Sequence, residues 1–215
     1  MEWLDFEGRP TVKKIKKNDS KSETQPRGLP VVLSSPSGAG KTTVSISLLA
    51  LEPNMVRSVS CTTRPRRKGE KNGRDYFFMT PERFKQMRDQ NGFLEWAKVY
   101  NNYYGTPKAW VEERLAEGRD VLFVIDIQGA RSLRKRLPEA IHLFLNPPDW
   151  ETLKARLSGR GSESPETLRL RLQTARLELR EAPRYDHQVV NDRVAWAVGR
   201  IRRILRLERK KRQKA

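Results

Sequence analysis

The sequence is poor in the residues that build cross-links, metal centres and membrane spans. A single cysteine, Cys61, excludes an internal disulfide framework and a zinc site built from cysteines. No apolar stretch approaches the length of a membrane span. The first seven residues also lack the basic start and apolar centre of a signal peptide. We therefore expect a cytoplasmic protein that makes no membrane contact.

Positive charge is what the chain has in excess. Lysine and arginine number 44 against 26 acidic residues, a net charge of +18, which favours a polyanionic partner. Residues 200–215 alone hold nine basic residues and one acid, with Ile201, Ile204, Leu205 and Leu207 between the arginines. Two interpretations stay open: a terminal helix docked by its apolar stripe with a solvated basic face, or a contact with RNA or a membrane surface. We expect the docked helix.

The order of apolar runs indicates an α/β fold. A chain of 215 residues is most simply one domain with inserted subdomains. Residues 1–27 are polar and basic, and we expect a disordered extension. Continuous apolar runs at 29–33, 120–126 and 140–145 alternate with helical segments, as in a parallel sheet flanked by helices and joined by right-handed crossovers. A last core strand is predicted at 188–191.

Weaker signals place the remaining elements. The segment 61–73 is polar and crowded with charge, so it is predicted to be a loop rather than core. Thr80 precedes Pro81 as a good helix cap. The other predicted elements are strands at 55–60, 75–79 and 94–99, a turn at 103–107, and helices from 44 to 51, 81–90, 108–116, 129–137, 149–157, 165–182 and from 193 onward.

Residues 34–43 form a predicted phosphate-binding segment, which we take as the functional centre of the chain. A buried strand precedes them and a helix follows, and the Gly-Lys-Thr ending is typical of a phosphate-binding P-loop. The glycines let backbone N–H groups approach a polyphosphate, and the helix N-terminus adds its positive dipole end. Lys41 is predicted to be an exposed, mobile charge for the outer phosphates, and Thr42 to help hold Mg²⁺. Ser35 stands where the pattern has its first glycine.

A second phosphate site is predicted apart from this loop. Arginine forks bind phosphate in bidentate fashion, and residues 64–70 carry several, followed by the hydroxyl of Tyr76. Asp126 closes a strand at the carboxyl edge of the sheet, where it can hold Mg²⁺ through water or bind a nucleotide; capping the next helix is its alternative role. Two phosphate sites favour transfer from one nucleotide to another over hydrolysis.

Several separate motifs resemble the guanylate kinase family. The stretch 58–76 is similar to the family's GMP-binding signature, and segments 93–97, 102–106, 125–129 and 156–161 continue the match in family order. The resemblance covers about residues 28–205. It implies a P-loop NTPase fold with a core at 28–59 and 120–215, a GMP-binding subdomain at 60–119, and a lid at about 157–170.

The resemblance also implies a role for each matching residue. Guanine offers two adjacent donors that one carboxylate can accept together, whereas adenine offers an acceptor there and would face Glu95 unfavourably. The GMP phosphate is expected at Arg64, Arg67, Tyr76 and Tyr104, with Glu70 buttressing the arginines, and the base at Ser60, Glu95, Thr106 and Asp126. ATP is expected at Ser35, Pro36, Ser37, Gly38, Ala39, Gly40, Lys41, Thr42, Thr43 and Asn191. The catalytic residues would be Lys41 with Arg156, Arg160 and Arg171.

Two positions depart from the family pattern. Ser35 replaces the first glycine of the loop, which the family tolerates. Val124 stands two residues before Asp126, where the family usually has an acid that helps to place Mg²⁺. Metal placement is thereby left to Thr42 and Asp126, acting through water, and to the ATP phosphates.

The expected reaction is Mg²⁺-dependent phosphoryl transfer from ATP to GMP or dGMP, by a monomer or homodimer. A phosphate monoester is largely dianionic at neutral pH, its second pKa being about 6, so no general base is needed. The alternative is a non-catalytic module of the same family that binds phosphorylated partners, but such modules tend to lose the lysine and lid arginines that this chain keeps. Contact of the basic ends with RNA is a third, less favoured hypothesis.

Overall fold

A computed structural model of the chain describes residues 26–99, 101–158 and 165–214. Most of the predicted extension (1–25) and the centre of the predicted lid (159–164), with Arg160, lie outside the described residues. The predictions made for them therefore stay predictions.

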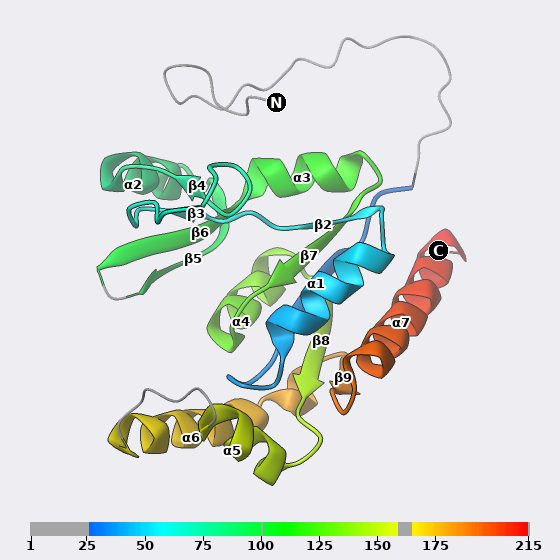
Figure 1. Cartoon of the computed structure of the whole chain (residues 1–215). Helices are drawn as coiled ribbons and strands as arrows, with labels where there is room; N and C mark the ends of the chain where they lie inside the picture. The colour runs from blue at the N-terminus through cyan, green and yellow to red at the C-terminus, as the bar shows by residue number, and fades with distance from the viewer. Residues whose placement is uncertain (1–25, 100, 159–164, 215) are drawn as a thin grey trace.

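The core is a five-stranded parallel sheet, which confirms the predicted fold class (Figure 1). Its strand order is β2-β7-β1-β8-β9, so β1 is central and is flanked by the two other long buried strands. All five residues of β1 are buried, as expected for a strand covered on both faces. The strands are β1 (Pro30–Ser34), β2 (Met55–Arg57), β7 (Asp120–Val124), β8 (Ile141–Asn146) and β9 (His187–Val190).

Helices cover both faces of this sheet. On one face, α1 (Lys41–Leu51) and α7 (Val194–Lys214) lie side by side and share one apolar cluster with β1 and β8 (Figure 1). On the other, α3 (Lys108–Ala116) and α4 (Ile127–Arg136) pack against β1 and β7. Burying both faces makes the sheet rigid, and its carboxyl edge then holds the loops that follow each strand in fixed positions.

The terminal helix α7 docks through an apolar stripe, as predicted. Ala197, Val198, Ile201 and Leu205 are buried, because helical spacing places them on one face. Leu207 was expected in this stripe, but it is 52% exposed. Two arginines on α7 bind Glu52, with Nε of Arg202 at 2.7 Å and Nη2 of Arg209 at 2.9 Å, and Arg209 also pairs with the buried Asp120. Part of the basic charge therefore anchors the helix.

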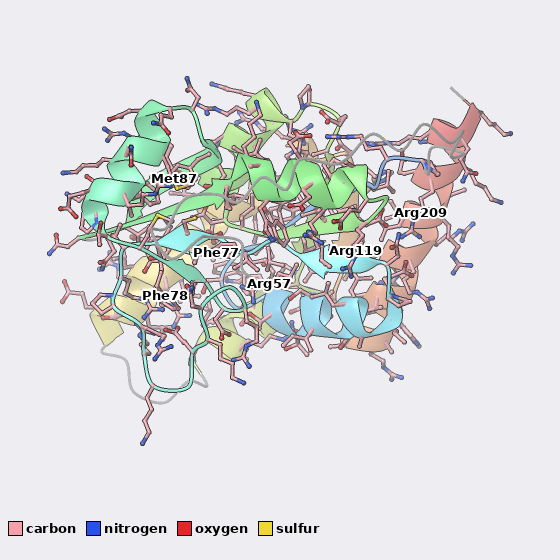
Figure 2. All side chains as sticks on the ribbon, turned by 90° about the horizontal axis from the view of Figure 1, so that it is seen from above. Arg57, Phe77, Phe78, Met87, Arg119 and Arg209 are labelled. Carbon is pink, nitrogen blue, oxygen red and sulfur yellow. The ribbon has the colours of Figure 1, made fainter. Side chains whose placement is uncertain are left out.

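A second, smaller sheet extends from the core. Its order is β4-β3-β6-β5, with β3 and β4 parallel and the other pairs antiparallel. Phe77, Phe84 and Phe93 form its apolar cluster, with Met87 at the edge. Figure 2 shows Phe77 and Met87 at one end of the molecule and Arg209 of α7 at the other. The elements are β3 (Cys61–Thr62), β4 (Phe77–Phe78), α2 (Pro81–Asp89), β5 (Phe93–Val99) and β6 (Asn102–Pro107).

Two predictions for this part of the chain were wrong. The predicted loop 61–73 begins with the buried strand β3, because its first residues, Cys61 and Thr62, are uncharged and pair with β4 and β6; the charged run starts only at Arg64. The predicted turn 103–107 is instead strand β6, which pairs with β5 along its whole length. The pairing of β3 with β6 joins residues distant in sequence, which local composition does not reveal.

Most other boundaries agree within a few residues. Strands 55–60 and 75–79 are shorter than predicted, α4 begins two residues earlier, and the predicted 165–182 helix ends at Leu179. Thr80 caps α2, accepting from the backbone N–H of Arg83. The remaining elements are α5 (Trp150–Ser158), α6 (Pro165–Leu179) and the 3-10 turn η1 (Ala182–Arg184). Within the described ranges, no helix combines the length and apolarity needed to cross a bilayer.

Candidate active site

The predicted phosphate loop connects β1 to α1 at the carboxyl edge of the sheet. Gly38 and Gly40 have φ of 84° and 92°, in the left-handed region that favours glycine. A Cβ on Gly40 would lie 2.4 Å from Nδ2 of Asn191, and that amide donates to the Ala39 carbonyl at 2.7 Å. The buried Asn191, from the end of β9, therefore fixes the loop backbone. The first N–H groups of α1 have no intrahelical acceptor, so they are available to an anion.

Lys41 lies at the start of α1 and is not the exposed side chain that the sequence predicts. It is partly buried, and its Nζ donates to the Ile125 carbonyl at 2.7 Å. Burial lowers the pKa of Lys41, while the nearby charges of Asp126 and Glu178 oppose that shift. The ammonium is therefore held at the loop, between it and the end of β7. Thr42 beside it is exposed, and its hydroxyl can reach a metal or a phosphate.

A pocket of about 460 Å³ opens beside this loop. Arg156, from α5, reaches it and donates to the Asn191 carbonyl at 3.4 Å. Arg156, a predicted catalytic residue, and Asn191, a predicted ATP-site residue, therefore meet at the phosphate loop, although they come from separate parts of the chain. Asp192 and Val194 also line the pocket, and neither was predicted to belong to it. The full lining is Gly38, Gly40, Thr43, Arg156, Asn191, Asp192 and Val194.

Asp126 lies between the two predicted pockets. It follows β7 and caps α4, accepting the Gly129 N–H at 2.8 Å, so the alternative role considered for it is real. The cap occupies one carboxylate oxygen, Oδ1, and the side chain remains exposed. Burial lowers the pKa of Lys41 and raises that of Glu95; the charge of Asp126 opposes the first shift and adds to the second. Asp126 is therefore close enough to both sites to act on both.

Glu95 and Thr106 meet across the β5–β6 hairpin. They pair in register, and the buried Thr106 donates its hydroxyl to Oε1 of Glu95 at 2.5 Å. Burial raises the pKa of Glu95; Thr106 opposes this shift, and Asp126 adds to it. Ser60 lies just before β3, and its carbonyl accepts from the Phe77 N–H. A half-buried carboxylate with one oxygen held by a hydroxyl can accept from a flat polar ligand edge.

The predicted second phosphate site is organised around Arg64. Its Nη2 lies 2.6 Å from Oε1 of Glu70, and its guanidinium lies over the Tyr76 ring, 5.5 Å from the centroid. Glu70 also accepts the backbone N–H of Arg67 at 2.8 Å, so one carboxylate binds both the Arg64 side chain and the backbone in the middle of the loop. The Arg64 and Arg67 contacts keep the pKa of Glu70 below its usual range. Tyr76 packs edge-on against Tyr104, 6.0 Å between centroids. The side chains of four predicted residues thus lie together, those of Arg64, Glu70, Tyr76 and Tyr104, whereas Arg67 joins them through its backbone and is exposed.

The residues predicted to hold Mg²⁺ fit that ion in type, though not as a complete site. Mg²⁺ in nucleotide sites is bound by one or two carboxylates, water and phosphates, and Thr42 and Asp126 supply a hydroxyl and one carboxylate. Val124 packs against the core cluster and brings no oxygen. Among the described residues, no group of three acidic, histidine or cysteine side chains could hold a metal alone. The remaining ligands would have to come from phosphate and water.

Glu178 is a residue of this site that the sequence did not indicate. It lies on α6, and its Oε2 accepts the backbone N–H of Ser37 in the phosphate loop at 3.1 Å. Arg171, a predicted catalytic residue, donates from the same helix to Oγ of Ser37 at 3.1 Å. Glu178 is one of two acidic residues in this arginine-rich helix and carries no local signal, so only its contact with the loop reveals it.

The fold and the strand–loop–helix motif place the chain among the P-loop nucleotide-binding proteins. A family model described as guanylate kinase matches residues 27–208. The chain is 46% identical over 185 residues to a guanylate kinase of Symbiobacterium thermophilum, covering 86% of this chain and 88% of the relative. It is 48% identical over 187 residues to one of Novosphingobium aromaticivorans, covering 86% and 85%.

A solved structure agrees with these relatives. The crystal structure of guanylate kinase from Anaplasma phagocytophilum matches with a TM-score of 0.66 and 35% identity, covering 87% of this chain and 89% of that one. The chain therefore belongs to the guanylate kinase family, whose members are nucleoside monophosphate kinases acting on GMP. The resemblance inferred from the motifs is confirmed.

Proposed function

We propose that the chain transfers the γ-phosphoryl group of ATP to GMP or dGMP, giving ADP and GDP, with Mg²⁺. The observation that carries the proposal is the position of Asp126 in the fold: Lys41 of the phosphate loop donates to the carbonyl of the preceding Ile125 at 2.7 Å, and the helix α4 that Asp126 caps packs against β5, the strand of Glu95. The two nucleotides would therefore bind on either side of Asp126. Family membership supports the same reaction.

On the ATP side, the loop backbone would bind the phosphates and Lys41 would carry the positive charge that stabilises the moving group. Thr42 and Asp126 would hold Mg²⁺, which when bound neutralises charge on the phosphate oxygens. The pocket beside Asn191 and Arg156 would take the nucleoside. Arg171, already in contact with Ser37, is positioned to bind a phosphate oxygen at the same loop.

On the GMP side, Glu95 would accept the two adjacent donors of guanine, while Thr106 keeps the carboxylate oriented. Arg64, Arg67, Tyr76 and Tyr104 would hold the phosphate, and Glu70 would keep the arginines in place. Adenine presents an acceptor where guanine presents a donor, so AMP would leave a half-buried carboxylate unpaired. Specificity would then rest on Glu95.

The proposed transfer requires the two substrates to be positioned and does not require a general base. The GMP phosphate is already largely dianionic at neutral pH, so its oxygen can attack directly. Charge neutralisation by Lys41 and the arginines, with the two substrates held in line, would supply most of the acceleration. Closure around both nucleotides would exclude the water that could otherwise attack ATP.

A coupled assay of ADP release tests this function. We expect turnover with GMP and dGMP, little with AMP, and none when Mg²⁺ is chelated. ADP release that does not depend on any nucleoside monophosphate would contradict the transfer reaction. Binding of GMP without any ADP release would favour the non-catalytic module instead.

A further inference from the structure

The α6 helix contacts the phosphate loop through two charged side chains. Arg171 donates to Oγ of Ser37, and Glu178 accepts from the backbone N–H of the same residue, both at 3.1 Å. The two side chains are seven residues apart, which is two helical turns, so they lie on one face of α6. This face is turned toward the loop.

The Glu178 contact resembles that of a bound anion. P-loop amides bind phosphate by donating to its oxygens, and a carboxylate oxygen is the side-chain group closest to that acceptor in charge and geometry. Lys41, whose proposed role is to bind phosphate, is among the charges that act on Glu178. Burial raises the pKa of Glu178, whereas the Ser37 amide and Lys41 lower it. The Ser37 amide and Lys41 therefore favour the ionised form of Glu178 at a place where burial disfavours that form.

A carboxylate in this position cannot stay when a polyphosphate arrives. Like charges brought together in a partly buried site cost several kcal/mol, and the phosphate chain carries several negative charges. The Ser37 N–H is one donor and would exchange one acceptor for another. With the phosphate charges added near Lys41 and Asp126, an ionised Glu178 would no longer be stable in this position.

We propose that Glu178 is a positioning residue of the phosphate loop, which occupies the Ser37 amide as a stand-in for phosphate and leaves when the polyphosphate binds. This inference rests on the proposed function of the loop. The contact holds the Ser37 N–H in the orientation that a phosphate oxygen would use, and it lowers the affinity for ATP because the carboxylate competes.

Inorganic tripolyphosphate tests the competition without any transfer. We would titrate it into the full chain by calorimetry in the absence of Mg²⁺, with wild type, Glu178→Gln and Glu178→Ala. Both variants remove the competing charge, so we expect about fivefold to tenfold tighter binding. The matched control is Glu181→Gln, since Glu181 lies three residues on, pairs with Arg131 at 2.7 Å and makes no described contact with the loop. The control should bind as wild type does.

A pH series adds a readout that a merely structural role would not move. Protonation of Glu178 removes its charge, so the gap between wild type and Glu178→Gln should close as the pH falls through the pKa of this group, which burial raises. The titration of tripolyphosphate itself is common to both proteins and cancels in the comparison.

Three outcomes would overturn parts of the account separately. Equal or weaker tripolyphosphate binding by folded Glu178→Gln and Glu178→Ala would refute the stand-in role. Weaker binding of Mg²⁺–ATP alone, with tripolyphosphate unchanged, would assign Glu178 to the metal and likewise refute it. A wild-type protein that does not bind tripolyphosphate at all would instead refute the proposed function of the loop.

Discussion

The two predicted phosphate sites differ in what they are made of. The loop between β1 and α1 offers backbone amides, and its shape is fixed by the buried Asn191 and by two glycines in the left-handed region. The site around Arg64 offers side chains, held in place by Glu70 and by the ring of Tyr76 on short strands of the smaller sheet. The first site is a property of the fold, whereas the second depends on individual ion pairs.

This difference predicts which substitutions should weaken each site. A backbone site tolerates changes in its side chains apart from the lysine, because most of its donors belong to the main chain. A side-chain site loses affinity when a supporting residue is removed, since its arginines then regain rotamer freedom. Single substitutions can therefore separate the two sites.

The largest expected effect is at the backbone site. Lys41→Ala should lower kcat/KM for GMP about 10³-fold, because the charge on the transferring group loses its held counter-charge. The measurement is ADP release at saturating ATP, with thermal unfolding to show that the fold persists. Lys135→Ala, on the exposed part of α4, removes the same charge elsewhere and should leave turnover unchanged. Normal turnover by Lys41→Ala would refute the role given to the loop.

Base selection should show the next largest effect. Glu95→Gln replaces one acceptor oxygen by a donor, so kcat/KM for GMP should fall about 100-fold, while the low rate with AMP should change little. Steady-state assays with both nucleotides give the ratio. Glu117→Gln, on the exposed end of α3, is the matched control. An unaltered preference for GMP in Glu95→Gln would place guanine recognition on other residues.

Removing the residue that supports the arginines should impair GMP turnover less than removing a group that touches the substrate. Glu70→Gln removes the charge that holds Arg64 and the backbone of Arg67, so KM for GMP should rise about tenfold with kcat nearly unchanged. Asp75→Asn is the control, because Asp75 accepts from Lys71 in the same loop without touching either arginine. A fall in kcat alone would contradict this division of roles.

The smallest effect is a pH dependence of GMP binding. Burial raises the pKa of Glu95 above the 4.5 of a free glutamate. GMP needs the ionised carboxylate, so its affinity should fall as the pH is lowered through the raised value, and this part of the dependence should be absent in Glu95→Gln. In the free protein the sign is opposite: stability contributed by the protonated form is present below pH 4.5 and is lost as the pH rises through the folded pKa. Calorimetry and thermal unfolding across pH measure the two trends.

The sequence predicts the parallel sheet and the phosphate loop better than it predicts the smaller sheet. Runs such as 120–126 are long, apolar and bounded by turn residues, so their state follows from composition. Strands β3 and β6 pair with each other across more than forty residues, in addition to their pairs with β4 and β5, and Thr62 and Thr106 are buried there although both are polar. The partial burial of Lys41 and the reach of Glu178 to Ser37 likewise arise from packing that no local pattern encodes.

Simultaneous occupancy of the two pockets is the most direct test. We would titrate GMP by calorimetry into the protein saturated with a non-hydrolysable ATP analogue and Mg²⁺. We expect one GMP to bind per chain, with an affinity equal to or tighter than that measured without the analogue, and we expect that binding to be lost in Glu95→Gln. If the analogue displaced GMP, the two nucleotides would share one pocket, and transfer between adjacent sites would be refuted.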